Sequence, residues 1–217
     1  MSTIVLIRPG RTDYDDQSRL LGNLEMPMND RGLDDVEKII RQLQQDGVQL
    51  EAILTSDVDP SCSTARLIAE ALKGAKVREL DELRNVDQGL WQGLPEADVR
   101  KRYPRFFRTG REKPQSICPP EGETLSEACH RIQKVLNKAI RKYDVFAIIV
   151  PEPVATVIRC TLQQRCPDVS ACLCGEEKRP LVEYLQSAEF DSDWFANCEH
   201  CSTAELSMSP PSSENLS

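Results

Sequence analysis

The sequence predicts a three-layer α/β fold in which a largely parallel central sheet is flanked by helices. Two observations carry this prediction: short apolar runs alternate with amphipathic stretches along the chain, and several of those stretches have recognisable helix-start or helix-stop residues. Strands that alternate with helices favour a parallel sheet, because each helix returns the chain across one face of the sheet to the next strand. The length of 217 residues is enough for one substantial hydrophobic core.

Five apolar runs are predicted to be strands, in chain order Thr3–Ile7, Ala52–Thr55, Lys76–Leu80, Val145–Val150 and Leu181–Leu185. Five stretches between or after them are predicted to be helices, namely Leu33–Gln45, Ser61–Leu72, Glu96–Tyr103, Thr124–Tyr143 and Val154–Arg165. The first helix carries apolar residues at helical spacing and is expected to stop at Gly47. The fourth begins with a capping box formed by Thr124 and Glu127.

Composition narrows the class of protein. The formal net charge is −8, which argues against a general nucleic-acid binder. No apolar run approaches the roughly 18 residues of a membrane span, and no secretory leader is recognisable, so we expect a cytoplasmic protein that does not contact membranes. The cysteines number nine, an odd count, and we expect most of them to be reduced.

Residues 1–201 are expected to form a single domain, with a basic, proline-punctuated insertion at about residues 100–118. Residues 202–217 read STAELSMSPPSSENLS, a Ser/Pro-rich segment almost without large apolar side chains. Such a segment cannot bury enough apolar surface to offset its loss of conformational entropy, so we expect a disordered tail.

The first predicted strand ends in Arg8-Pro9-Gly10-Arg11-Thr12, and the frame continues without a gap through Arg19, Gly22, Glu25, Pro27 and Gly32. This pattern resembles the histidine phosphatase superfamily, the phosphoglycerate-mutase-like proteins, whose first strand ends in Arg-His-Gly-x-Thr/Ser. Four later segments are similar to family elements in the same order: LTSDVDPSCSTARLIAEAL, DELRNVDQGLWQG, PPEGETLSEACHRI and FAIIVPEPVATVIR. The resemblance covers roughly residues 3–160 and implies the family's α/β fold.

The resemblance also implies a chemistry for the site. In the family, one histidine attacks a phosphate monoester, two arginines and a second histidine hold the phosphoryl oxygens, and a carboxylate protonates the leaving group. In this chain the nucleophile position is Pro9, the second-arginine position is Pro60, the acid position is Asn85 and the second-histidine position is Glu152. Among these five positions Arg8 alone keeps the family residue.

We therefore expect a catalytically inactive pseudophosphatase with no catalytic residue and no cofactor, which binds an unknown protein or small-molecule ligand. Glu152 would repel a phosphate dianion, and we expect it to form a salt bridge with Arg8. Arg8, Arg11 and Thr12 are the candidate ligand-binding residues. Pro151 and Pro153 remove backbone N–H groups from the turn that would otherwise suit an anion.

One alternative is an enzyme. The chain would then act as a phosphatase or phosphomutase on small phosphate monoesters through a rearranged site, with Glu152 assisted by Asp13, Asp15 or Asp16. A cysteine nucleophile at Cys62 is the less favoured form of this idea, because DPSCSTAR lacks a glycine-bearing loop of backbone donors and places the thiol in a helix.

The second alternative is a metal-stabilised interaction module. Its candidate ligands are Cys172, Cys174, Cys198 and Cys201, with His200 as a substitute, and four such ligands suit a tetrahedral zinc ion. Reduced, unligated cysteines are the favoured interpretation. The basic stretch RKRYPRFFRTGREK likewise has two interpretations, a surface for an anionic partner or a solvated, lid-like insertion over the pocket.

Overall fold

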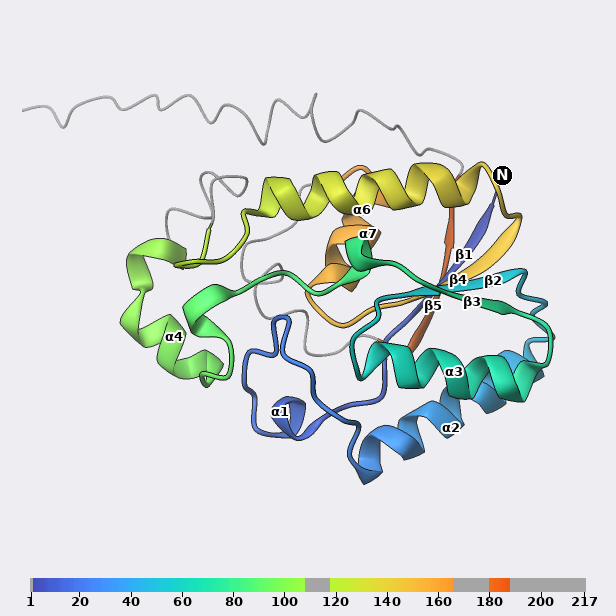
Figure 1. Cartoon of the computed structure of the whole chain (residues 1–217), viewed down its shortest axis with the longest axis horizontal. Coiled ribbons are helices and arrows are strands. Elements are labelled where there is room, and N and C mark those ends of the chain that lie inside the picture. The colour runs from blue at the N-terminus through green and yellow to red at the C-terminus, as the bar shows by residue number, and fades with distance from the viewer. Residues whose placement is uncertain (1, 108–117, 166–179, 188–217) are drawn as a thin grey trace, which may run out of the picture.

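A computed structural model describes residues 2–107, 118–165 and 180–187. Its centre is a five-stranded sheet with the order β3-β2-β4-β1-β5 (Figure 1). The strands are β1 (Thr3–Ile7), β2 (Ala52–Thr55), β3 (Lys76–Glu79), β4 (Val145–Ile149) and β5 (Val182–Gln186). All five predicted strands are confirmed, with boundaries that shift by a residue in the last three.

Strand pairing determines where the strand ends meet. β1 and β2 both run parallel to β4, whereas β5 pairs with β1 in the antiparallel direction. In this register Ile149 of β4 is the partner of both Ile7 and Thr55. The carboxyl ends of three neighbouring strands are therefore level with one another, and the residues that follow them share one edge of the sheet.

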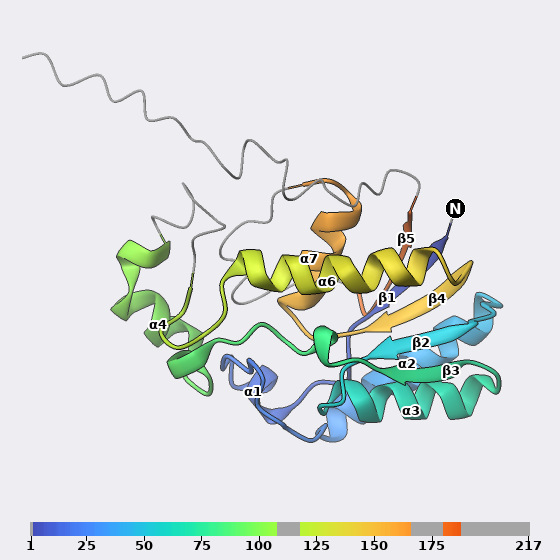
Figure 2. The same ribbon diagram turned by 45° about the horizontal axis from the view of Figure 1, so that its top comes forward.

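Helices lie on both faces of the sheet. The helices are α1 (Asp13–Asp16), α2 (Asp30–Gln45), α3 (Ser61–Leu72), α4 (Glu96–Arg102), α6 (Leu125–Ile140) and α7 (Val154–Leu162), with short 3-10 turns at Asp81–Leu83 and Gly89–Trp91. Figures 1 and 2 show α2 and α3 on one face and α6 and α7 on the other. None of the helices in the described ranges is long and apolar enough to cross a membrane.

The core divides into two layers because successive strand residues point to opposite faces. Ile4 and Leu6 of β1 belong to the cluster that includes α6 and α7. Val5 and Ile7 belong to the cluster that includes α2 and α3. All four side chains are buried, so the sheet is covered on both sides and the predicted three-layer architecture is confirmed.

The predicted start of α6 and the predicted end of α2 are confirmed. The Thr124 hydroxyl accepts from the backbone N–H of Glu127 at 3.1 Å, while the Glu127 carboxylate accepts from the backbone N–H of Thr124 at 2.8 Å. Gly47 lies just after α2 with φ +64°, a left-handed conformation that glycine adopts without steric cost. Three helix ends were predicted too long: α4 ends at Arg102, α6 at Ile140 and α7 at Leu162.

We expect Leu136→Ala to lower the free energy of unfolding by about 2–5 kcal/mol, because it opens a cavity in a fully buried layer between α6 and the sheet. The matched control is Leu90→Ala, whose side chain is 61% exposed and which should change stability by no more than about 0.5 kcal/mol. Denaturant unfolding of both variants measures the difference. Equal losses would contradict the layer assignment.

Candidate functional site

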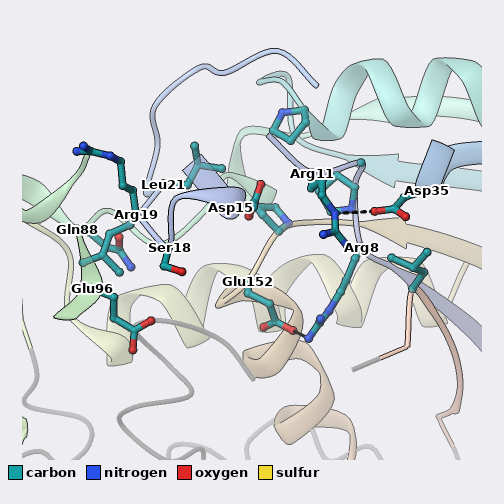
Figure 3. Close-up of a pocket in the computed structure, with 16 residues that line it drawn as sticks. Arg8, Arg11, Asp15, Ser18, Arg19, Leu21, Asp35, Gln88, Glu96 and Glu152 are labelled. Atoms are coloured by element: carbon teal, nitrogen blue, oxygen red, sulfur yellow. Dashed lines mark hydrogen bonds and ion pairs between the residues drawn. The ribbon is translucent and has the colours of Figure 1, made fainter. Parts of the chain in front are cut away.

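A pocket of about 380 Å³ opens at the carboxyl edge of the sheet (Figure 3). Most of its residues come from the turn after β1, the α1 region, the start of α3 and the turn between β4 and α7. The lining consists of Arg8, Pro9, Gly10, Arg11, Asp15, Ser18, Arg19, Leu20, Leu21, Asp35, Pro60, Gln88, Glu96, Pro151, Glu152 and Leu181. Four of the five family positions, Arg8, Pro9, Pro60 and Glu152, therefore line one cavity, and Asn85 is not part of its lining.

The predicted salt bridge between Arg8 and Glu152 is confirmed. Arg8 Nη2 donates to Glu152 Oε1 at 2.6 Å, and the two side chains are only 18% and 14% exposed. The second carboxylate oxygen, Oε2, accepts from the backbone N–H of Thr156 at 3.0 Å and from its hydroxyl at 2.7 Å. Glu152 thus joins the end of β1 to the first turn of α7.

A second ion pair, which sequence reasoning missed, continues this connection. Arg159 of α7 is 3% exposed and holds Glu183 of β5 through two hydrogen bonds, of 2.8 Å from Nε and 2.6 Å from Nη2. Arg159 Nη2 also lies 3.8 Å from Glu152 Oε1. The signal was present in the sequence, since Arg159 interrupts the otherwise apolar stretch VATVIRCTL.

Asn85, at the acid position, is buried and has a structural contact with the same turn. Its Nδ2 donates to the backbone carbonyl of Glu152 at 3.0 Å, and its Oδ1 accepts from the backbone N–H of Val86. An amide in this position has no proton to give to a leaving group at neutral pH.

Arg131 fixes the segment that carries Asn85. It donates to the carbonyl oxygens of Glu82, Arg84 and Asn85, and it forms an ion pair with Glu123. Its role is therefore to hold the loop in place rather than to reach the pocket.

Arg11 and Thr12 differ in their positions. Arg11 lines the pocket and its Nε donates to Asp35 at 2.8 Å. Burial of Asp35 disfavours its charged form, but hydrogen bonds from Lys38 and Arg11 outweigh burial and lower its pKa.

Thr12 is buried and forms a capping box with Asp15 at the start of α1, a short helix that was not predicted. Its ligand-binding role stays a prediction.

The three aspartates proposed for the enzyme alternative do not all line the pocket. Asp15 lines the pocket together with Glu152. Asp13 and Asp16 are outside the pocket lining, where both accept hydrogen bonds from Asn29 Nδ2 at 3.1 Å and 3.0 Å.

The interpretation of Cys62 as a buried helical cysteine is supported. Burial, together with a hydrogen bond from its thiol to Glu79, raises the pKa of Cys62 to about 11. Little thiolate forms near neutral pH at such a value, so this sulfur is a poor nucleophile.

The proposed zinc ligands Cys172, Cys174, Cys198 and Cys201, with His200, lie outside the described residues, as does the 202–217 tail. Within the described ranges there is no cluster of three or more potential metal-ligating side chains. The metal alternative therefore stays untested by the geometry.

The aromatic residues of the basic stretch pack inward where the structure describes them. Phe106 lies edge-on to Trp91 with 4.6 Å between ring centroids, and Phe107 and Tyr103 also contact that indole. Residues 108–117 of the insertion fall outside the description. The two phenylalanine rings thus pack, partly buried, against a small local core.

We expect Arg159→Ala to destabilise the protein by about 3–5 kcal/mol, because it leaves the Glu183 carboxylate buried without its partner. Arg84→Ala is the matched control, since Arg84 also binds a carboxylate, that of Asp57, through two hydrogen bonds but on the surface. Its removal should have little measurable effect. Denaturant titrations of both variants make the comparison, and similar losses would contradict the buried network.

Comparisons with known proteins agree with this architecture. Phosphoserine phosphatase 1 of Hydrogenobacter thermophilus is 26% identical over 150 residues, which cover 69% of this chain and 70% of that protein. A bifunctional protein of Mycobacterium tuberculosis is 27% identical over 162 residues, or 73% of this chain but 44% of that protein.

Among solved structures, a mycobacterial glucosyl-3-phosphoglycerate phosphatase in complex with VO3 superposes with a TM-score of 0.66 at 21% identity, covering 78% of this chain and 85% of that one. This likeness confirms the predicted phosphoglycerate-mutase-like fold. The family model of the histidine phosphatase superfamily (branch 1) matches residues 4–164. The chain therefore belongs to the histidine phosphatase superfamily.

Proposed function

We propose that this chain is a non-catalytic member of its superfamily, whose pocket serves binding or scaffolding rather than phosphoryl transfer. The observation that carries the proposal is the engagement of Arg8, the cation at the end of β1, by the Glu152 carboxylate at 2.6 Å. An arginine held in this way has an anion of its own and is not available to gather the oxygens of a substrate phosphate unless that pair breaks.

The residues around Arg8 support the same proposal. Pro9 has no lone pair on its side chain and cannot carry a phosphoryl group. Pro60 lines the pocket with an uncharged ring, so it supplies no donor for phosphoryl oxygens. Asn85 uses its amide N–H on the backbone of Glu152. A nucleophile, a second cation and an acid are thus all replaced by residues without those capacities.

The charge of the lining points in the same direction. Three arginines and four carboxylates line the pocket, so its formal balance is −1. Two of the arginines, Arg8 and Arg11, already form ion pairs with Glu152 and Asp35. A pocket with this balance offers a phosphate dianion no net attraction, whereas a neutral or cationic ligand would not be repelled.

A second candidate function is phosphatase or phosphomutase activity through a rearranged site. The names of the relatives favour it, since those that carry an assigned activity are phosphatases or a phosphoglycerate mutase. Among the three candidate aspartates, Asp15 is the one that lines the pocket, and its Oδ2 accepts hydrogen bonds from the backbone N–H and the hydroxyl of Thr12 at 2.6 and 2.8 Å. In this case Asp15→Asn would abolish turnover.

We expect the purified protein to release no phosphate from p-nitrophenyl phosphate or 3-phosphoglycerate above the buffer rate, because it lacks a nucleophile and an acid. The control is Arg8→Ala, which separates a contaminating phosphatase from the protein's own activity. Activity that persists in both Arg8→Ala and Asp15→Asn is contamination. Turnover that disappears in Arg8→Ala or Asp15→Asn would overturn the proposal in favour of the rearranged enzyme.

Restoring the nucleophile alone should not restore catalysis. We expect Pro9→His to stay at the background rate, since the missing donor at position 60 alone corresponds to a loss on the order of 10²–10³ in rate and cooperating groups are non-additive. The combined variant Pro9→His, Pro60→Arg, Asn85→Glu and Glu152→His is the comparison. Turnover by Pro9→His well above background would show that the other three positions do not matter as proposed.

A further inference from the structure

We infer that Glu152 is a built-in occupant of an oxyanion-binding site formed by Arg8, Thr156 and Arg159. The site is present in the fold, but the chain fills it with its own carboxylate. The inference deepens the proposed function, on which it rests for the statement that the wild-type pocket does not take phosphate. The ligand class that would bind in place of the carboxylate is a small tetrahedral oxyanion such as phosphate or sulfate.

The contacts of the carboxylate are those of a bound anion. Oε1 accepts from Arg8 Nη2 at 2.6 Å and has Arg159 Nη2 at 3.8 Å. Oε2 accepts from the backbone N–H of Thr156 at 3.0 Å and from its hydroxyl at 2.7 Å. Two guanidinium groups, one hydroxyl and one amide thus converge on two oxygens, and Figure 3 shows the Arg8 end of this arrangement.

Charge balance favours an anion at the position of Glu152. The ion pairs among the described residues connect Arg8, Arg159, Glu152 and Glu183, whose formal charges sum to zero. Glu183 is already bound by two hydrogen bonds from Arg159. Removal of Glu152 takes one negative charge away from these four largely buried side chains, and the loss of a buried partner charge is unfavourable. A free anion is the simplest replacement.

The first turn of α7 adds a backbone donor to the two arginines. Thr156 lies in the first turn of α7, which spans Val154–Leu162. The backbone N–H of Ala155 is taken by the carbonyl of Pro151, so the Thr156 N–H is the donor aimed at Glu152. Donors at this end of a helix favour negative charge.

In the wild-type protein a free oxyanion would have to displace a carboxylate that is tethered to the site. A tethered group competes at a high effective concentration, so it excludes a dilute ligand that offers similar contacts. Glu152 is therefore both the counter-ion that stabilises the buried arginines and the group that closes the site to phosphate.

The test is the binding of inorganic phosphate to Glu152→Ala, measured by calorimetry and by the midpoint of thermal unfolding. We expect phosphate to bind this variant at least about tenfold more tightly than the wild type, a difference of about 1.4 kcal/mol, and to raise its unfolding midpoint. Sulfate should act similarly, whereas sodium chloride at equal ionic strength should not.

Three controls make the result specific. Glu96→Ala removes another carboxylate from the same pocket lining and should gain no phosphate binding. Glu152→Gln removes the charge but keeps the site filled, so it should bind phosphate more weakly than Glu152→Ala. Arg8→Ala combined with Glu152→Ala should lose the response, because one of the two guanidinium groups is gone.

The outcomes separate the inference from the proposed function. A folded Glu152→Ala that does not respond to phosphate, or responds no more than Glu96→Ala, would overturn the inference and leave the proposed function standing. Turnover by the wild type would overturn the proposed function instead. If Glu152→Ala folds only when phosphate or sulfate is present during refolding, that rescue supports the inference, and failure of both anions to rescue it counts against the inference.

Discussion

The ion pair between Arg8 and Glu152 is the interaction on which the pocket depends. β1 and β4 are parallel neighbours in register, so the residues that follow them meet at one edge of the sheet. One oxygen of Glu152 binds Arg8 and the other binds Thr156 of α7, while Arg159 extends the connection to Glu183 of β5. These charged contacts link three adjacent strands and a helix at the edge of the sheet.

Most of the fold follows from the sequence because its core residues repeat at the periods of strands and helices. The strands β1 and β2 and the helix α3 have the predicted boundaries, since apolar runs and turn residues bound them sharply. The short helix α1 was not predicted, because four residues are too few to show a helical periodicity. Its sequence signal is the capping box of Thr12 and Asp15. Helix ends at α6 and α7 were placed too late, because the residues that follow, RKY and QQR, include no glycine or proline to mark a stop.

A contact in the site can be predicted from the sequence where a charged residue at one position requires a residue of opposite charge at another. A cation at the end of β1 and a carboxylate after β4 must compensate each other once the fold brings them together, and the Arg8–Glu152 pair follows. The Arg159–Glu183 pair does not follow in this way, because β5 joins the sheet from a distant part of the chain and its neighbours are fixed only by tertiary packing. Thr12 has a structural role that its place in the motif did not indicate, because its hydroxyl caps the start of α1.

A double-mutant cycle on Arg8→Met and Glu152→Gln tests most directly that these two side chains form one energetic unit. Both substitutions keep the approximate shape of the side chain and remove its charge. We expect a coupling energy of about 2 kcal/mol from denaturant unfolding of the wild type, the two single variants and the double variant. The exposed pair Arg41–Glu37, four residues apart on α2, should give no more than about 0.5 kcal/mol in the same cycle. A coupling energy between Arg8 and Glu152 that is no larger than this surface value would contradict the central place given to their ion pair.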